Sequence, residues 1–513
     1  MLTRIEVGEQ EYCAYKQPEA YIAPGTYYVY QSSFKRTPSQ KAEFERIKKV
    51  LELKAVQNPE GKFLWLAPYE KWVKRVVDGT LDMIPAQVIE PDWSIIGVEP
   101  TKLRTWQRDC ITEAWTFLAS GLRYTKGWIA RIGSGKTLAG LAAMNMFEPE
   151  KCLVLADKYL FETWYSEANK WGFPRPILST YESAHKHNGR DIECLILDEV
   201  LKLKNPETQR SKAVEKISHN CRLVLGFTGI AVAAKRCQDF RWLRAVAPGS
   251  VPATEKAWQF AFGLDTRLEE LGGNKAYVTD TYNEEAIANF VSPFVRTIDQ
   301  TEVINELPDI QFNYIEVDAP GQFNLIKSGG ATTKGNPKRL AQVLQCTDGF
   351  IYNDDDKPVR VTSPKIPAVK DFVDNLGEPV ILVTNWSEGV QILREQLLDY
   401  NPSIIEGGSN FIGEITRFKE GHTQVMILNA GFSKGMNLQG VCRTIVFLST
   451  SSKPDDYEQM LGRVYRPGQK LGVNIVFFTC KDSLDKRRIE LVQKHKEYSA
   501  EVVERLLLEE LNK

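Results

Sequence analysis

The residues with the clearest chemical signature form a short segment that combines glycines with a lysine and a threonine. Ala130–Thr137 has the sequence ARIGSGKT, in which Gly-Lys-Thr follows an alanine after a short spacer. Segments of this kind form phosphate-binding loops, because their glycines let backbone N–H groups point at phosphate oxygens. Lys136 would contact the β- and γ-phosphates of a nucleotide, and the Thr137 hydroxyl would bind Mg²⁺. The predicted nucleotide contacts in this loop are Gly133, Ser134, Gly135, Lys136 and Thr137.

Two acidic residues farther along the chain could complete a hydrolytic site. The segment Leu195–Glu199, LILDE, is an apolar run that ends in Asp198 and Glu199. Asp198 would hold Mg²⁺ through water, and Glu199 would polarise the attacking water. An apolar strand that ends in Asp-Glu is often only a strand cap, so this interpretation depends on the pairing with the phosphate-binding loop.

A third group of candidate residues lies in Gln459–Gln469, QMLGRVYRPGQ. Arg463 and Arg466 are three positions apart, and we predict that they share one face of a helix. If they belong to a separate lobe, they can reach the γ-phosphate only when the lobes close, which would make hydrolysis depend on movement. The predicted catalytic set is Lys136, Asp198, Glu199, Gln459, Arg463 and Arg466.

Short apolar runs separated by helical stretches must position these groups. Such runs are typical of buried parallel strands and predict an α/β fold with two halves. The predicted strands are 127–130, 152–156, 194–198 and 222–227 in the first half, and 379–385, 424–429, 443–449 and 473–479 in the second. The variable segment between the halves contains the glycine- and lysine-rich stretch 327–339, predicted to be a loop. Residues from Leu484 onward are predicted to be helical.

Composition limits the class of protein. Of the 513 residues, 43% are hydrophobic and 26% are charged, which excludes wholesale disorder. No apolar run approaches the ~18 residues needed to span a bilayer, and the first residues lack the apolar core of a secretory signal. The nine cysteines are scattered without a Cys-x-x-Cys pair, which favours reduced thiols. We therefore expect a cytoplasmic protein without a membrane partner, and its net charge of −1 requires any nucleic-acid contact to be a local patch.

Residues 1–92 are predicted to form a small separate α+β module. Within them, residues 31–50 carry six basic and two acidic side chains, and aromatic-rich pieces flank this stretch. Basic and aromatic residues together suit contact with phosphates and with stacked bases. The alternative is that Trp65 and Trp72 form the core of the module. We favour the core for the tryptophans and DNA for the lysines and arginines.

Taken together, the motifs from about residue 100 to 480 resemble those of the Snf2-type branch of superfamily 2 helicases. Leu103–Gln107 is similar to the adenine-contacting segment of that family, which implies that Gln107 contacts the base. Other similar segments are 157–164 with 170–171, 179–182, 198–214, 227–229, 292–296 with 307–308, and 431–438. The first module weakly resembles the HARP domain of annealing helicases, in its aromatic strand 26–30, a basic helix ending in 46–56 and a strand at 61–66.

This resemblance implies two RecA-like parallel-sheet lobes with Snf2-type insertions, at residues 93–312 and 313–513, the second ending in a C-terminal helix. It implies an ATP- and Mg²⁺-dependent translocase that tracks on double-stranded DNA and remodels or reanneals forked or branched DNA, as in DNA repair. The implied sequence-independent DNA contacts are Lys158, Thr180, Lys204 and Thr228, with Lys202 beside them. A bacterial or phage-infected cell, with the protein associated with the nucleoid, is the expected setting.

The sequence also departs from the family pattern. Ser134 replaces a leucine, Val200-Leu201 replace Ala-His, Ile230-Ala231 replace Thr-Pro, and Ser449 replaces an aspartate. The ATP-site residues are kept, so the departures concern coupling. Two alternatives stay open: a strand-separating helicase or restriction-type motor, and a nucleotide-sensing scaffold without motor activity. A fused nuclease is not expected, because no aspartate precedes the Glu-x-Lys triplets at 52–54 and 60–62.

Overall fold

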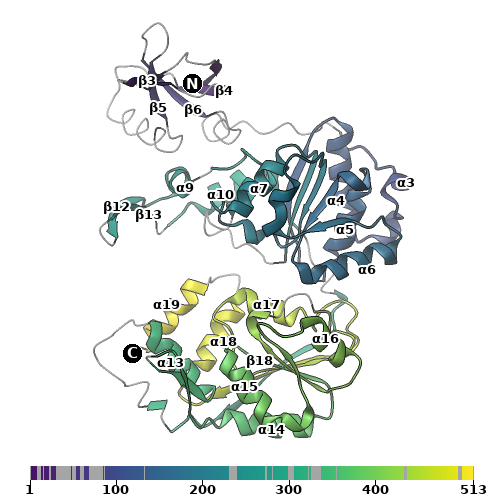
Figure 1. The fold of residues 1–513 in the computed structure, drawn as a ribbon, viewed down its shortest axis with the longest axis vertical. Helices are drawn as coiled ribbons and strands as arrows, with labels where there is room; N and C mark the ends of the chain where they lie inside the picture. Colours follow the sequence, from purple (N-terminus) through teal and green to yellow (C-terminus); the bar gives the residue numbers. More distant parts are fainter. Residues whose placement is uncertain are drawn as a thin grey trace. The chain divides into compact units, whose positions relative to one another are not determined.

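The computed structural model describes residues 2–7, 13–14, 17–21, 25–30, 48, 53–57, 63–68, 85 and 87–511, apart from 132, 230–239, 253, 272–273, 280, 299–304, 322, 325–336, 354, 433–435 and 495–499. The chain divides into two compact units (Figure 1). The first comprises residues 1–130 and 135–299, and the second comprises residues 131–134 and 300–513. The domain limits 1–92, 93–312 and 313–513 stay a prediction.

The N-terminal strands of the first unit form a six-stranded sheet of order β1-β4-β6-β5-β2-β3, with antiparallel pairings throughout. These strands are β1 Leu2–Val7, β2 Cys13–Ala14, β3 Gln17–Tyr21, β4 Gly25–Tyr30, β5 Lys54–Gln57 and β6 Phe63–Pro68. The aromatic strands predicted at 26–30 and 61–66 are present as β4 and β6. Lys54–Val56, predicted as the end of a basic helix, instead belong to β5, where Val56 is buried and pairs with Leu64. Apart from Lys48, the basic stretch 31–50 lies outside the described residues, as do Trp72 and the side chain of Trp65.

The second sheet of the first unit is six-stranded and entirely parallel, in the order β14-β7-β11-β10-β8-β9. Its strands are β7 Tyr124–Ile129, β8 Cys152–Leu155, β9 Ile177–Ser179, β10 Cys194–Leu197, β11 Leu223–Thr228 and β14 Val295–Thr297. Its helices are α3 Trp93–Ile96, α4 Thr105–Ala119, α5 Lys136–Met144, α6 Phe161–Trp171, α7 Gln209–Ser218, α8 Leu243–Val246, α9 Glu255–Phe262 and α10 Glu284–Val291. A hairpin, β12 Arg267–Leu271 and β13 Asn274–Val278, follows α9.

Alternating residues of these strands build a core on each face of the sheet. Val154 and Ile196 pack with α4, α5 and α6 on one face. Leu153 and Leu195 pack with α7, α8, α9 and α10 on the other. A parallel sheet buried on both faces favours strands that are apolar at nearly every position, which explains the continuous apolar runs in the sequence.

The second unit contains a second parallel six-stranded sheet, of order β15-β22-β21-β18-β20-β19. Its strands are β15 Ile310–Val317, β18 Val380–Thr384, β19 Ser403–Ile405, β20 Val425–Asn429, β21 Thr444–Phe447 and β22 Val473–Cys480, and β16 Phe350–Tyr352 and β17 Pro358–Arg360 form a hairpin. Its helices are α13 Pro337–Thr347, α14 Lys365–Leu376, α15 Ser387–Gln396, α16 Phe411–Lys419, α17 Pro454–Leu461, α18 Asp485–Gln493 and α19 Ala500–Leu511. Helices α14 and α15 pack on one face, and α13 with α16–α19 on the other.

The two parallel sheets confirm the predicted fold class of two α/β, RecA-like lobes. Every strand predicted for the two halves is present, and the helical C-terminus is present as α18 and α19. Pro337, Lys338 and Arg339, predicted as the end of a loop at 327–339, instead form the first turn of helix α13. Proline is favoured in the first turn of a helix, where no N–H donor is needed. Residues 327–336 lie outside the described part.

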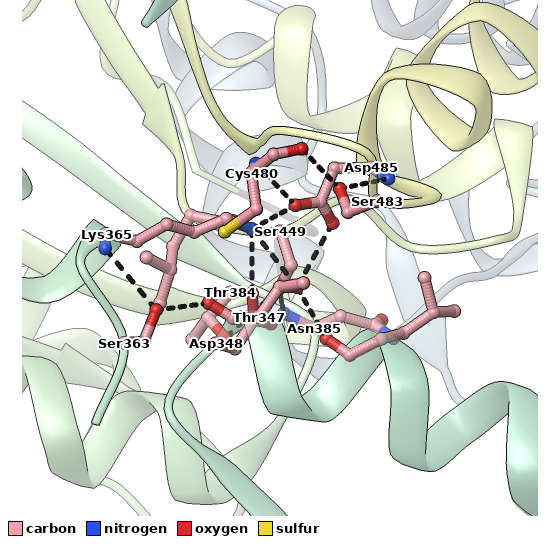
Figure 2. A network of polar contacts seen from close by, with 12 residues as sticks. Thr347, Asp348, Ser363, Lys365, Thr384, Asn385, Ser449, Cys480, Ser483 and Asp485 are labelled. Carbon is pink, nitrogen blue, oxygen red and sulfur yellow. Dashed lines mark hydrogen bonds and ion pairs between the residues drawn. The ribbon is translucent and has the colours of Figure 1, made fainter. Parts of the chain in front are cut away.

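A buried cluster of charged residues lies at the carboxyl ends of the strands in the second sheet (Figure 2). The Nζ atom of Lys365 lies 2.7 Å from an Asp485 oxygen and 3.2 Å from an Asp348 oxygen, and Arg488 lies 3.4 Å from Asp485. Burial alone would lower the pKa of Lys365, but Asp485 and Asp348 outweigh it and raise that pKa. Ser449, where the family pattern has an aspartate, accepts the Asn385 N–H at 3.0 Å in this cluster.

Lys365→Ala is expected to destabilise the second unit by about 3–5 kcal/mol, because it removes the buried ammonium that the Asp348 and Asp485 carboxylates share. Hydrogen exchange in peptides that cover β18, β21 and β22 of the full chain would measure this loss. Lys370→Ala on the same helix is the matched control, since its partner Asp374 (2.9 Å) is exposed. Equal exchange in the two variants would contradict a stabilising role for the cluster.

Candidate active site

The predicted phosphate-binding loop has the expected structural context. It follows strand β7, which ends at Ile129, and precedes helix α5, which begins at Lys136. Gly133 and Gly135 adopt left-handed backbone conformations, with φ of 81° and 90°. A side chain at Gly135 would also place its Cβ 2.6 Å from the Gln107 amide nitrogen. The loop therefore requires glycine at this position for both backbone conformation and space.

Lys136 and Thr137 form the first turn of α5, and both are half-buried. The Lys136 Nζ atom donates a hydrogen bond to the Ala130 carbonyl at 2.7 Å, so its side chain folds back across the base of the loop. The N-terminus of α5, a nine-residue helix, directs backbone N–H groups into the same loop. Ser134, where the family pattern has leucine, is buried.

Gln107, predicted to contact the adenine base, lies beside this loop. Its amide nitrogen donates to the Gly135 carbonyl at 2.8 Å, and its amide oxygen accepts the Arg104 N–H at 2.9 Å. The side chain is only 2% exposed. Gln107 thus ties the start of helix α4 to the phosphate-binding loop, and contact with a base stays a prediction.

Asp198 follows directly after β10, as the sequence predicted. The Trp164 indole nitrogen donates to its Oδ2 atom at 2.9 Å. Burial raises the pKa of Asp198, whereas the Trp164 hydrogen bond and the Lys136 charge act to lower it. Lys136 and Asp198 follow strands β7 and β10, which both neighbour β11 and end at the same edge of the parallel sheet.

Glu199 has an unusual backbone conformation for a residue with a side chain. Its φ of 58° and ψ of 57° lie in the left-handed region. Such a conformation costs of order 1–3 kcal/mol and persists only where the surroundings impose it. The backbone is held on the preceding residue, because the buried Tyr181 hydroxyl donates to the Asp198 carbonyl at 2.7 Å. The chain therefore turns at Glu199, between the end of β10 and the short 3-10 helix Val200–Leu203.

The donor set around the loop fits Mg²⁺ bound with a nucleotide. Hydroxyl and carboxylate oxygens are ligands that this cation prefers. Thr137 follows β7 and Asp198 follows β10, and both strands are neighbours of β11 in the sheet. Because parallel strands end at the same edge, Thr137 and Asp198, the two residues predicted to hold Mg²⁺, lie at one edge of the sheet.

The arginine segment in the second unit differs from its predicted form. Helix α17 ends at Leu461, so Arg463 and Arg466 lie in the turns that follow and not on one helix face. The Arg463 side chain replaces the helical hydrogen bonds there: its Nε donates to the Gln459 carbonyl at 2.9 Å, and its Nη1 to the Met436 carbonyl at 3.2 Å.

These bonds join the two predicted motifs of the second unit. Arg466 donates to the side-chain oxygen of Asn437, and the Leu438 N–H donates to the Arg463 carbonyl at 3.1 Å. Arg463 is 8% exposed and Gln459 is 6% exposed, whereas Arg466 is half-buried. Hydrogen bonds therefore hold residues 436–438 and residues 459–466 together within this unit.

The predicted DNA contacts have different environments. Lys158 and Lys204 are exposed and Thr180 is half-buried, but Thr228 is fully buried at the end of β11. Lys202 is half-buried and forms an ion pair with Asp157. The two exposed lysines can contact a phosphate backbone without a change in the structure. DNA contact by Thr228 stays a prediction, and the burial of this residue does not favour it.

Sequence reasoning missed Trp164 and Tyr181 as neighbours of the acidic pair. Both lie in segments that we assigned to DNA contact because of the family resemblance. The available signal was chemical, since a buried indole or phenol usually needs a hydrogen-bond partner. The contact was not predicted because these aromatic residues are far from Asp198 in the sequence.

Comparison with known proteins gives one family match. Residues 364–468 match the helicase conserved C-terminal domain. No curated protein matches the sequence. Among solved structures, the Sulfolobus solfataricus SWI2/SNF2 ATPase core in complex with double-stranded DNA is similar at 18% identity, with 83% of this chain and 97% of that chain covered and a TM-score of 0.35. No described helix has the length and apolar character needed to cross a membrane. Residues 364–468, which lie in the second unit, are therefore similar to the helicase conserved C-terminal domain.

Proposed function

We propose that this chain is an ATP-dependent DNA translocase of the superfamily 2 type. The observation that carries the proposal is the pairing of Lys136 with Asp198 at one edge of the first parallel sheet. Strands β7 and β10, which precede these two residues, both neighbour β11 and end at this edge, and two glycines of the loop between β7 and α5 adopt left-handed backbone conformations. The helicase C-terminal domain of the second unit supports the same class of function.

Each residue of this edge has a distinct role in ATP hydrolysis. The backbone N–H groups of the loop and the Lys136 amine hold the β- and γ-phosphates. Thr137 and Asp198 hold Mg²⁺, which neutralises charge on the phosphate oxygens when bound. Glu199 orients the attacking water and accepts its proton. Gln459, Arg463 and Arg466 of the second unit complete the site when DNA and ATP bring the units together.

DNA is the partner that best suits the exposed lysines of the first unit. Lys158 precedes helix α6, and Lys204 follows the acidic pair in the sequence. A phosphate bound at either position would therefore contact a segment that also contributes to the proposed ATP site. Such contacts are independent of sequence and sensitive to salt. We propose further that residues 1–92 add the choice of forked or branched DNA, because they hold the six basic residues of 31–50 and no nucleotide motif.

ATP hydrolysis is expected to be stimulated by DNA, and the expected movement is along duplex DNA without strand separation. Steady-state hydrolysis with duplex, single-stranded and forked DNA tests the first point, and displacement of a third strand from a triplex tests the second. Removal of residues 1–92 should reduce the forked-DNA signal and leave stimulation by plain duplex intact. Unwinding of a plain duplex would instead favour a strand-separating helicase, and ATP binding without any turnover would favour a nucleotide-sensing scaffold.

A further inference from the structure

Trp164 makes a contact that a purely structural tryptophan does not need. It lies on helix α6, and its indole nitrogen donates to Asp198 Oδ2 at 2.9 Å. Its side chain is 1% exposed. A buried carboxylate accepts this bond, although many neutral acceptors would satisfy an indole. The bond therefore fixes the orientation of the carboxylate as well as that of the indole.

The same indole also contacts the helix that carries the other proposed Mg²⁺ ligand. At Gly140 of helix α5, a side-chain Cβ would lie 3.1 Å from the Trp164 ring and 3.0 Å from the Phe227 ring. The absence of a side chain at this position lets the ring lie close to the helix. Gly140 is one turn after Lys136 and Thr137 on α5, so the ring spans from this helix to Asp198.

We propose that Trp164 is a positioning residue that sets Asp198 relative to Thr137 so that the two can hold Mg²⁺ together. This inference rests on the proposed nucleotide site. Groups that orient metal ligands through hydrogen bonds commonly affect metal affinity about 10–100-fold. Trp164 has the features of such a group, because it is buried, donates to the ligand and packs against the element that carries the partner ligand.

The direct test measures Mg²⁺ binding without turnover. Anisotropy of a fluorescent ADP derivative on the full chain would be recorded first in EDTA and then during a Mg²⁺ titration. Trp164→Phe keeps an aromatic ring and removes the donor. We expect unchanged ADP affinity in EDTA and a half-saturating Mg²⁺ concentration that is about 10–100-fold higher.

Helix α6 offers a matched control. Trp171 lies on the same helix, and its indole nitrogen donates to Glu167 at 3.2 Å, away from Asp198. Trp171→Phe makes the same chemical change and should leave the Mg²⁺ titration at its wild-type position. A shift as large as that of Trp164→Phe would show that the effect arises from helix α6 as a whole and would overturn the proposal.

A second variant guards against loss of folding in Trp164→Phe. β-(3-Benzothienyl)alanine at position 164 keeps the bicyclic shape of tryptophan and replaces the N–H group by sulfur. The proposal requires the higher Mg²⁺ requirement in this variant as well. A wild-type titration, or an equal loss of ADP affinity in EDTA, would overturn it, since either result makes Trp164 a packing residue only. If the wild-type chain fails to bind ADP, or binds it without any response to Mg²⁺, the proposed nucleotide site itself is wrong.

Discussion

Arg466→Ala is expected to lower DNA-stimulated ATP turnover by about 10³–10⁵-fold, which is the range for an arginine that stabilises the transition state of phosphoryl transfer. The guanidinium is half-buried and donates to the Asn437 side chain, so it is held in one orientation within the second unit. An arginine side chain that is already held in one orientation loses little conformational entropy when it binds a phosphate. Single-turnover hydrolysis of ATP, with and without duplex DNA, measures the effect.

The control for this variant is Arg487→Ala. Arg487 is an exposed residue of the same unit, and its partner is Glu490 at 3.4 Å on the surface of helix α18. This variant should keep wild-type turnover, and both variants should keep DNA affinity at constant salt. If Arg466→Ala loses DNA binding and retains its basal hydrolysis, Arg466 faces DNA and not the nucleotide.

The sequence predicted the sheets well because buried parallel strands carry a strong local signal. Val380–Val383 and Cys194–Leu197 are apolar at every position, and each is buried on both faces of its sheet. The loop between β7 and α5 was equally clear, because the glycines and the lysine of its motif are adjacent in sequence. Both signals are local, and for this reason one sequence was sufficient.

Features that depend on contacts between distant segments were harder to predict. Arg463 and Arg466 have helical spacing, yet helix α17 ends at Leu461, and the Arg463 side chain donates to the carbonyls of Gln459 and Met436. Likewise, Lys54–Gln57 follows a helix-like basic stretch but pairs with β6 as a strand. In both cases tertiary hydrogen bonds outweigh local preference, which is weak for a segment of a few residues.

The buried lysine of the second unit shows the same limitation in another form. The local sequence around Ser363, Lys365 and Asp485 does not indicate that these residues lie in one cluster. Lys365 and Asp485 stand at the starts of α14 and α18, and the parallel sheet brings these starts to the same edge. The sequence alone therefore gave no sign that the charge of Lys365 is buried.

Glu199→Gln is expected to reduce ATP turnover by about 10²–10⁴-fold, the usual range for loss of a general base. Glutamine has nearly the shape of glutamate, so the left-handed backbone at this position, φ 58°, carries the same strain in both chains. The variant therefore changes the charge and proton affinity of the group without changing the turn. Because the phosphate contacts come from the loop and Lys136, the variant should still bind ATP, and rapid-quench hydrolysis together with ATP-binding anisotropy separates the two steps.

Lys136→Ala gives the opposite pattern and serves as the comparison. The amine that would contact the β- and γ-phosphates is lost, so ATP affinity should fall together with turnover. Two variants at one edge of the sheet would then affect different steps, as expected if Lys136 holds the nucleotide and Glu199 acts on water. Wild-type turnover in either variant would place hydrolysis elsewhere. Loss of ATP binding in Glu199→Gln would show that this glutamate holds the nucleotide or the loop, and the general base would then have to be sought among the other carboxylates of the first unit.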